Sequence, residues 1–286
     1  MNQVIQNVSD TAFLVAGFRA AETERETPLF RDPLAAKLAG DHGRNILATV
    51  PNSFVGGWSV VIRTVIIDGF IEQAIKEGVD TILNLGAGLD TRPYRMDLPR
   101  SLHWIEVDYP HVIELKETRL AEEKPRCRLE RLALDLTDRP ARKAFLARVN
   151  AAADKILVLT EGVTPYLTEA DVGALADDLR QTDKVRYWIT DYFSPEALKF
   201  GAKMRRKFMR NAPFQFAPRD WFAFFAELGW RASEVRYISE EAERLGRPIP
   251  LPLWLRLWVK AATIFTSRAR RERMRRFAAY VLLVPK

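Results

Sequence analysis

Residues 81–96 read TILNLGAGLDTRPYRM, and this stretch decides the fold of the chain. An apolar run that is typical of a buried strand ends in a glycine turn, which leads to Asp90 and Arg92. A turn between a first strand and the next helix lies at the carboxyl edge of a parallel sheet, where open α/β folds bind their ligands. Gly86 and Gly88 lack β-carbons, so ligand atoms can approach this backbone closely. The stretch therefore predicts an α/β fold with a ligand site at the glycine loop.

From residue 80 onward, short β-rich runs alternate with helical segments, which favours parallel βαβ units with right-handed crossovers. The expected strands are 81–86, 102–108, 128–136, 155–162, 185–193, 233–239 and 277–286. The last of these runs has no crossover helix after it, so we expect it to enter antiparallel, beside the run before it. The sequence thus predicts a mostly parallel, seven-stranded sheet with an antiparallel last strand.

The residues before the glycine loop show the apolar spacing of helices. Helices are expected over 9–25, over 32–40 with Gly40 at the end, and over 60–78 as an amphipathic helix. After residue 194 the strand–helix alternation breaks. Further helices are expected there over 195–210 and 218–229.

Composition excludes several classes of protein. Of the 286 residues, 48% are apolar and 28% are charged, which favours a folded chain over a disordered one. A single cysteine, Cys127, excludes an intramolecular disulfide and a Cys-rich zinc site, so we expect no metal centre and a reducing, cytoplasmic location. The first ten residues lack the basic segment and the apolar core of a secretory signal.

The net charge of +7 is unevenly distributed, with basic clusters at 199–210 and 268–276. Such clusters could attract acidic ligands or a membrane surface, or could be solvated helix faces. No nucleic-acid-binding motif accompanies them, so no nucleic-acid partner is expected. The apolar stretch 249–265 is too short to span a bilayer, but it could lie on a membrane, cover a pocket or pack in the core. Peripheral membrane contact through 249–276 stays open, as does the oligomeric state.

The glycine loop carries neither of the common phosphate-binding motifs. The P-loop pattern GxxxxGK[ST] is absent, and the dinucleotide fingerprint requires a third glycine where this chain has Thr91. A glycine pair alone is also compatible with a plain tight turn. The acidic residues make a ligand site the better interpretation, because Asp108, Asp135 and Glu161 each end a predicted strand at the same edge of the sheet.

The positions of these acids indicate a nucleoside. Asp108 lies 20 positions after Gly88, where an acid in nucleotide-binding folds accepts hydrogen bonds from a ribose diol. Asp135 or its backbone neighbours can contact the amine and ring nitrogens of adenine. A cleft lined with acids would repel pyrophosphate and favour a cation, and S-adenosylmethionine combines a sulfonium, an amino group, a diol and adenine. Its carboxylate then needs an arginine, for which Arg63 and Arg92 are the candidates.

The chain resembles S-adenosylmethionine-dependent methyltransferases of the leucine carboxyl methyltransferase type, including bacterial O-methyltransferases, over roughly residues 10–195. The resemblance rests on TAFLVAGFRAAETER, PLFRDPLAAKLAG, VIRTVIIDGF, NLGAGLDTRPYR, WIEVDYP, LALDL and LTEGVTPYL, in that order. It implies a Rossmann-like class I methyltransferase fold with S-adenosylmethionine as cofactor. We expect a single domain over 1–286, with a helical cover over 1–78, a cofactor-binding core over 79–194, and a cover insertion with the final strands over 195–286.

The resemblance also implies roles for particular residues. It assigns the methionine carboxylate to Arg63, the methionine and ribose side to Gly86, Ala87 and Gly88, the ribose hydroxyls to Asp108, the adenine to Asp135 and Leu136, and the methionine amino end to Glu161. This chain has VTPY after Glu161, where family members usually have a small or apolar residue and a Leu-Met-Tyr-like run. Pro165 is therefore expected to reshape the wall beneath the acceptor.

The expected reaction is an in-line displacement at the sulfonium methyl group, for which the protein aligns the reactants and excludes water. A carboxylate acceptor is already ionised, whereas a hydroxyl needs help with its proton. His42, His103 and His111 are expected to be structural or solvated, the last two flanking the second strand on the ribose side.

The residues expected on the acceptor side are Arg19, Tyr166 and Tyr192. The function predicted is O-methylation of a carboxylate or hydroxyl of a small molecule. The alternatives are an NAD-linked oxidoreductase and a non-catalytic nucleoside-binding module.

Overall fold

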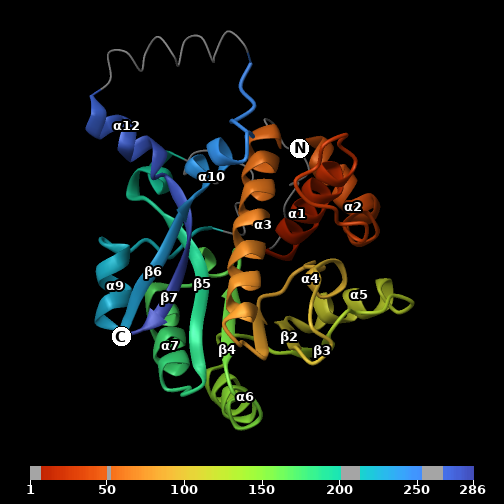
Figure 1. Cartoon of the computed structure of the whole chain (residues 1–286), viewed down its shortest axis with the longest axis vertical. Coiled ribbons are helices and arrows are strands. Elements are labelled where there is room, and N and C mark those ends of the chain that lie inside the picture. The colour runs from red at the N-terminus through yellow and green to blue at the C-terminus, as the bar shows by residue number, and fades with distance from the viewer. Residues whose placement is uncertain (1–7, 50–52, 201–212, 253–266) are drawn as a thin grey trace.

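The structure is a computed structural model that describes residues 8–49, 53–200, 213–252 and 267–286 (Figure 1). Its centre is a seven-stranded sheet of order β3-β2-β1-β4-β5-β7-β6. The strands are β1 (Thr81–Leu85), β2 (His103–Asp108), β3 (Arg128–Ala133), β4 (Ile156–Thr160), β5 (Val185–Phe193), β6 (Trp230–Tyr237) and β7 (Ala278–Pro285). β1 to β5 are parallel, and β7 is antiparallel to both β5 and β6. The predicted topology is confirmed.

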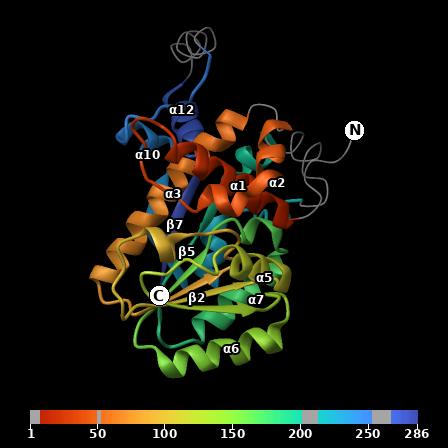
Figure 2. The same ribbon diagram turned by 90° about the vertical axis from the view of Figure 1, so that its right-hand side faces the viewer.

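Helices surround this sheet on both faces (Figures 1 and 2). They are α1 (Val8–Thr23), α2 (Ala35–Thr49), α3 (Ser53–Lys76), α4 (Arg92–Arg95), α5 (Pro110–Arg119), α6 (Arg139–Ala152), α7 (Glu169–Arg180), α9 (Trp221–Glu227), α10 (Ile238–Arg244) and α12 (Arg268–Arg275), with a short 3-10 helix, η1 (Thr164–Tyr166). α6, α7 and α9 contribute side chains to the core on one face, and α3 and α10 to the core on the other. α1 packs against α2 and α3.

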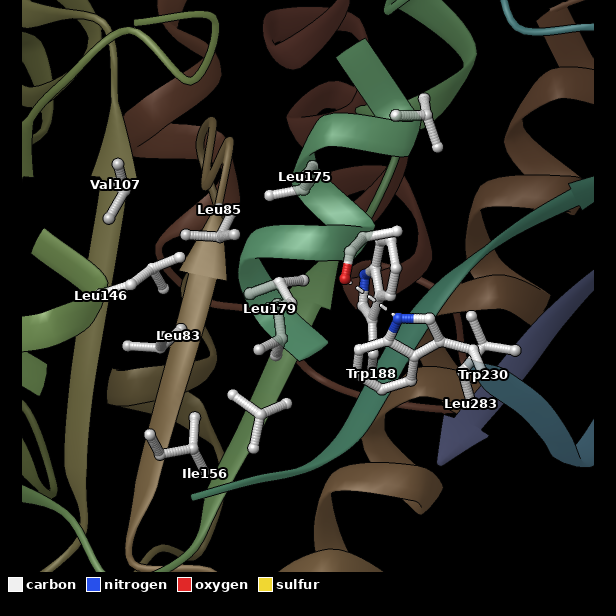
Figure 3. Close-up of a cluster of buried hydrophobic side chains, with 14 of the residues drawn as sticks. Leu83, Leu85, Val107, Leu146, Ile156, Leu175, Leu179, Trp188, Trp230 and Leu283 are labelled. Atoms are coloured by element: carbon white, nitrogen blue, oxygen red, sulfur yellow. Dashed lines mark hydrogen bonds between the residues drawn. The ribbon is translucent and has the colours of Figure 1, made fainter. Parts of the chain in front are cut away.

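The central strands are apolar along their whole length because both faces are covered. Every residue of β1 and β4 is buried. On the α7 face, Trp188 of β5 and Trp230 of β6 meet edge to face with their ring centroids 5.3 Å apart, next to Leu175 and Leu179 (Figure 3). Both indole nitrogens are satisfied, since Trp188 donates to Thr160 Oγ1 and Trp230 donates to a backbone carbonyl of α7.

Several boundaries differ from the predicted ones. α3 begins seven residues before the predicted start at residue 60, and it is a core helix rather than an amphipathic one, with Ile62, Ile67 and Phe70 fully buried. At Gly40 the backbone leaves the helical region (φ 57°), as the predicted end requires, but helical structure resumes and continues to Thr49. β3 ends at Ala133, so Asp135 lies in the following loop rather than in a strand.

Most of the predicted helix 195–210 and most of the apolar stretch 249–265 lie outside the described residues, and so do the side chains of 268–270. Those predictions stay untested. Among the described residues, no helix combines the length and the hydropathy that a membrane span requires.

Candidate functional site

A cavity of about 440 Å³ opens at the carboxyl edge of the sheet, above the ends of β1, β2 and β4. It is lined by all of the site residues predicted from sequence except Arg92 and Tyr192: Arg19, Arg63, Gly86, Ala87, Gly88, Asp108, Asp135, Leu136, Glu161 and Tyr166. Thr11, Ala12 and Val15 of α1 close it from one side. Its volume suits one ligand of drug or cofactor size.

The glycine loop is shaped by tight contacts on two sides. Gly86 and Gly88 have positive φ angles of 70° and 47°, which favour glycine. A β-carbon on Gly86 would overlap the Val163 side chain, which follows β4, and one on Gly88 would lie 3.3 Å from Ala12 Cβ of α1. The loop is therefore held between the turn after β4 and the first helix.

Asp108 extends from the end of β2 into the cavity. Its Oδ2 accepts a hydrogen bond from Gly88 N and its Oδ1 accepts one from Tyr109 N, both at 2.7 Å. Burial raises the pKa of Asp108, although these two backbone donors oppose the rise. Each carboxylate oxygen has a second lone pair, so Asp108 can still accept hydrogen bonds from a diol.

Asp135 and Leu136 border the cavity from the loop after β3. Asp135 Oδ1 accepts hydrogen bonds from Thr137 N at 2.9 Å and Thr137 Oγ1 at 2.8 Å. The Leu136 carbonyl accepts one from Arg142. This loop is thus held in one conformation by its own side chains.

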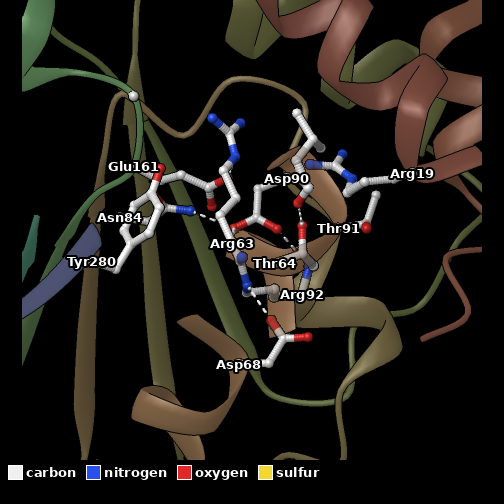
Figure 4. A network of polar contacts seen from close by, with 12 residues as sticks. Arg19, Arg63, Thr64, Asp68, Asn84, Asp90, Thr91, Arg92, Glu161 and Tyr280 are labelled. Carbon is white, nitrogen blue, oxygen red and sulfur yellow. Dashed lines mark hydrogen bonds and ion pairs between the residues drawn. The ribbon is translucent and has the colours of Figure 1, made fainter. Parts of the chain in front are cut away.

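Glu161, after β4, belongs to a buried ion cluster formed by Arg63, Asp68, Asp90, Arg92, Arg95 and Glu161. Figure 4 labels these residues except Arg95. Glu161 Oε1 lies 2.9 Å from Arg63 Nε, and Oε2 lies 2.8 Å from Arg92 Nη1. Burial alone would raise the pKa of Glu161, but Arg92 and Arg63 outweigh it and lower the pKa. Glu161 does line the cavity, but its contribution to the predicted acidic character of the cleft is offset, because two arginines already neutralise this carboxylate.

The two arginine candidates for a ligand carboxylate are separated by the structure. Arg92 is 1% exposed and is bound by Asp68, Asp90 and Glu161. Arg63 lines the cavity, and its Nη1 and Nη2 make no hydrogen bond within the described part of the chain. Burial alone would lower the pKa of Arg63, but Tyr280, Glu161 and Asp191 outweigh it and raise the pKa. Arg63 is thus charged and has donors to offer.

Of the residues predicted for the acceptor side, Arg19 and Tyr166 line this cavity. Arg19 is 4% exposed; its Nε lies 2.9 Å from Asp32, and its Nη2 donates to the Leu89 carbonyl. Thr91 Oγ1 donates to the same Asp32 carboxylate at 2.6 Å. Arg19 therefore fastens α1 to the glycine loop.

The structure does not bring Tyr192 to the glycine loop. Its ring lies against Trp221 and Phe222, with centroids 5.6 and 5.3 Å away, in the wall of a second cavity of about 140 Å³. Thr164 and Pro165 line this second cavity, whereas Val163 and Tyr166 line the larger one. The turn after β4 thus separates the two.

None of the three histidines lines the larger cavity. His42 pairs with Asp10 at 3.0 Å, and the ring of His111 stacks on Tyr109 with centroids 5.9 Å apart. His103 starts β2 and lies 3.1 Å from Glu130 at the amino edge of the sheet, so its expected place on the ribose side is wrong. In the described ranges, no group of three or more His, Cys, Asp or Glu side chains could hold a metal ion.

Sequence reasoning missed Asp32, Asp68 and Asn84. Asn84 Nδ2 donates to Asp90 at 2.8 Å and so fixes one member of the ion cluster. Asp68 contacts Arg92 and Asp32 contacts Thr91, and because these pairs join distant segments of the chain, no local spacing indicates them. Asn84 lies only six residues before its partner, but nothing in the sequence pattern distinguishes it from any other strand residue.

A Rossmann-like sheet of this strand order, with a glycine loop and an acid at the end of β2 facing one cavity, is the fold of class I methyltransferases. A crystal structure of a Thermobifida fusca protein, provisionally described as a methyltransferase, has the same fold, with a TM-score of 0.59 and 15% identity over 100% of this chain and 97% of that one.

Sequence comparison gives the family. The model described as leucine carboxyl methyltransferase matches residues 12–180, and the chain belongs to this family. A protein of Streptomyces avermitilis, provisionally named an S-adenosyl-L-methionine-dependent methyltransferase, is 32% identical over 85% of this chain and 89% of its own length. A Frankia alni protein with the same kind of name is 30% identical over 85% and 88%. The cofactor is thus S-adenosylmethionine and not NAD.

Proposed function

We propose that this methyltransferase transfers the methyl group to an oxygen of a small molecule, with a carboxylate as the first candidate acceptor. The observation that carries the proposal is the chemistry of the cavity wall. Its described residues include carboxylates, amides and hydroxyls but no histidine, so the wall lacks the usual general base. A carboxylate acceptor is ionised near neutral pH and needs none. The name of the family model, leucine carboxyl methyltransferase, points to the same acceptor chemistry.

The residues of the cavity fit S-adenosylmethionine, group by group. Arg63 and Glu161 lie side by side with opposite charges, as the carboxylate and the ammonium of the methionine end require. Gly86 and Gly88 line the cavity, and the atoms between sulfur and ribose would lie against their backbone. Asp108 would accept the ribose hydroxyls, and Asp135 and Leu136 would border the adenine.

When bound, S-adenosylmethionine supplies an electrophilic methyl group and leaves as a neutral thioether. The protein contributes alignment and exclusion of water rather than acid–base chemistry. Thr11, Ala12 and Val15 of α1 cover the cavity, while the ion cluster beneath it holds Arg63 and Glu161 in place.

A hydroxyl is the second candidate acceptor, on a specific observation. Arg19 and Arg92 are already bound by internal carboxylates, so neither has its charge free to orient an acceptor carboxylate. An acceptor hydroxyl would instead find Tyr166 in the cavity wall.

The experiment is a screen with methyl-labelled donor and matched acceptor pairs, each pair sharing a carbon skeleton and differing in carrying a carboxylate or a hydroxyl. We expect label in methyl esters, which mild base hydrolyses. Label that survives base, carried by the hydroxyl member of the pairs, would shift the assignment to the second candidate. Label on nitrogen or carbon would contradict both.

A further inference from the structure

Asp191, at the end of β5, is a buried carboxylate next to the site. It is 3% exposed. Its Oδ2 accepts a hydrogen bond from Gly162 N at 2.9 Å, and its Oδ1 accepts one from Tyr280 Oη at 2.7 Å. Tyr280 lies directly opposite Asp191 in the β5–β7 pairing. The carboxylate is thus fixed by two donors from two different elements.

Through Gly162, Asp191 holds the turn that forms one wall of the larger cavity. Glu161, Gly162 and Val163 all line that cavity. Gly162 has a φ of 67° and directly follows Glu161. The position of Gly162 therefore sets the direction of the chain after β4 and with it the position of Glu161. On the other side, Val163 packs against Gly86. The turn is therefore fixed from below by Asp191 and from above by the glycine loop.

The charges around the methionine end do not cancel within the protein. The ion cluster together with Asp191 contains three arginines and four carboxylates: Arg63, Arg92, Arg95, Asp68, Asp90, Glu161 and Asp191. Asp191 is the member without a directly contacting arginine. The groups that face it are Arg63 from α3, Glu161 after β4 and Tyr280 from β7, and Arg219 and Asp220 border the smaller cavity with it.

We propose that Asp191 is a positioning residue whose charge is coupled to the charge of the bound cofactor. S-adenosylmethionine carries one net positive charge, and S-adenosylhomocysteine carries none. The cationic donor favours ionised Asp191, which holds Gly162 and completes the charge balance, so donor binding expels a proton from Asp191 and product binding expels less. This inference rests on the placement of the cofactor under Proposed function.

The environment of Asp191 supports this coupling. Burial raises its pKa to about 6, against the opposing effects of the Tyr280 hydrogen bond, Arg63 and the Gly162 amide. Near pH 6 the free protein therefore holds this proton about half of the time, and a nearby positive charge shifts the balance toward release.

Calorimetry on the full chain tests the proposal. The heat of binding at pH 6, measured in two buffers of different ionisation enthalpy, gives the number of protons released. We expect up to about half a proton per donor bound, and clearly less with S-adenosylhomocysteine. Between pH 7 and pH 5, donor affinity should fall by about fivefold if the donor lowers the pKa of Asp191 by one unit, and by about tenfold at most if the pKa falls further. In the proposed placement Asp108 faces the ribose, which both ligands share, and the Asp191→Asn variant separates any proton of Asp108 from that of Asp191.

Variants locate the proton. Asp191→Asn should abolish the difference between donor and product and flatten the pH dependence of donor affinity. Tyr280→Phe removes a hydrogen bond that lowers the pKa of Asp191, so the midpoint of that pH dependence should move to higher pH. Asp220→Asn, next to the same small cavity, is the control and should leave proton release unchanged.

Equal proton release with both ligands, or release that persists in Asp191→Asn, would overturn the proposal. If the Asp191→Asn variant does not fold, the comparison of donor and product with the wild-type protein decides the test. Failure of the donor to bind would instead contradict the placement of the cofactor itself, so the two failures are distinguishable.

Discussion

At the scale of single residues, Asp108 combines two tasks that its position in the chain predicted only in part. The spacing from Gly88 predicted a carboxylate that faces a ribose. The structure adds that the same carboxylate accepts hydrogen bonds from Gly88 N and Tyr109 N, so it also fixes the loop that a ligand would contact.

Asp108→Ala should therefore weaken binding of S-adenosylhomocysteine by about 2–4 kcal/mol, because charge-assisted hydrogen bonds are lost and the loop is released. Titration calorimetry measures the affinity, and circular dichroism checks the fold. Asp108→Asn keeps one acceptor oxygen, so its affinity for S-adenosylhomocysteine should lie between those of the wild type and Asp108→Ala. An unchanged affinity in Asp108→Ala would remove the central assignment of the site.

Gly86 and Gly246 form a matched pair for testing the glycine loop. Both have positive φ, but a β-carbon on Gly86 would overlap Val163, whereas one on Gly246 would meet nothing within 4 Å. Gly86→Ala should lower the free energy of unfolding by about 1–3 kcal/mol more than Gly246→Ala, and it alone should weaken cofactor binding. Urea denaturation and calorimetry give the two quantities. Equal effects at both positions would mean that the Val163 side chain can move away from the added methyl group with little loss of stability.

Asp191 has a stability effect whose sign is opposite to that of a salt-bridged acid. Its pKa is raised from 3.8 to about 6, so between these values the folded state binds more proton than the unfolded state. Its contribution to stability is present at low pH and falls as pH rises through that window. Asp191→Asn removes the dependence, so from pH 5 to pH 7 the wild type should lose about 1 kcal/mol relative to the variant. Urea unfolding of both proteins at the two pH values measures this.

The candidate site shows what single residues reveal before a structure exists. Gly86, Gly88, Asp108 and Glu161 stand at fixed places relative to predicted strands, and the fold carries them all to one edge. The partners of Arg19 and Glu161 could not be found in this way, because ion pairs between distant segments produce no recognisable spacing in the sequence. For the same reason, the neutralisation of Glu161 by two arginines was not predicted.

At the scale of elements, one buried ion pair anchors α1 beside the glycine loop. Arg19 and Asp32 lie 2.9 Å apart, and their side chains are 5% and 0% exposed. Arg19→Ala leaves Asp32 charged and unpaired, which should cost about 3–5 kcal/mol of folding free energy and also weaken cofactor binding. Urea denaturation measures the first effect.

Two further variants make the Arg19 result specific. Adding Asp32→Asn removes the stranded charge but keeps an acceptor for Thr91, so the double variant should be more stable than Arg19→Ala alone. Arg44→Ala breaks an exposed pair with Asp41 and should cost less than about 1 kcal/mol. If the double variant is no more stable than Arg19→Ala, the unpaired charge of Asp32 is not the cause of the destabilisation.

Elements were predicted well where local pattern and burial agree. All seven strands lie where β-rich runs indicated, because each run is bounded by turns and fills a buried layer. The predicted boundaries were wrong where tertiary contacts decide them. The first turns of α3 lie against α1, where Gly56 and Gly57 face the Phe18 ring. β3 stops before Asp135 because that side chain closes its own turn.

At the scale of the whole molecule, the identity of the acceptor should show in the pH profile. For a carboxylate acceptor, kcat should be flat between about pH 7 and 8, because a carboxyl group near its reference pKa of about 4 is already ionised. The KM for the donor should rise below pH 6, where Asp191 takes up its proton. Initial rates at saturating acceptor separate the two constants. A kcat that climbs through pH 7 to 8 would indicate a hydroxyl acceptor.

The interior position of β7 in the sheet has a consequence for how the sheet is closed. β7 is the last strand in sequence, yet it lies between β5 and β6. Removing β7 would split the sheet and leave β6 without a neighbouring strand. It would also expose an edge at β5, and exposed edges pair with other chains in aggregates. The insertion of β7 hides that edge and delivers the Tyr280 hydroxyl to Asp191. The closed sheet and the contact between Tyr280 and Asp191 therefore form together, when β7 pairs with both of its neighbours.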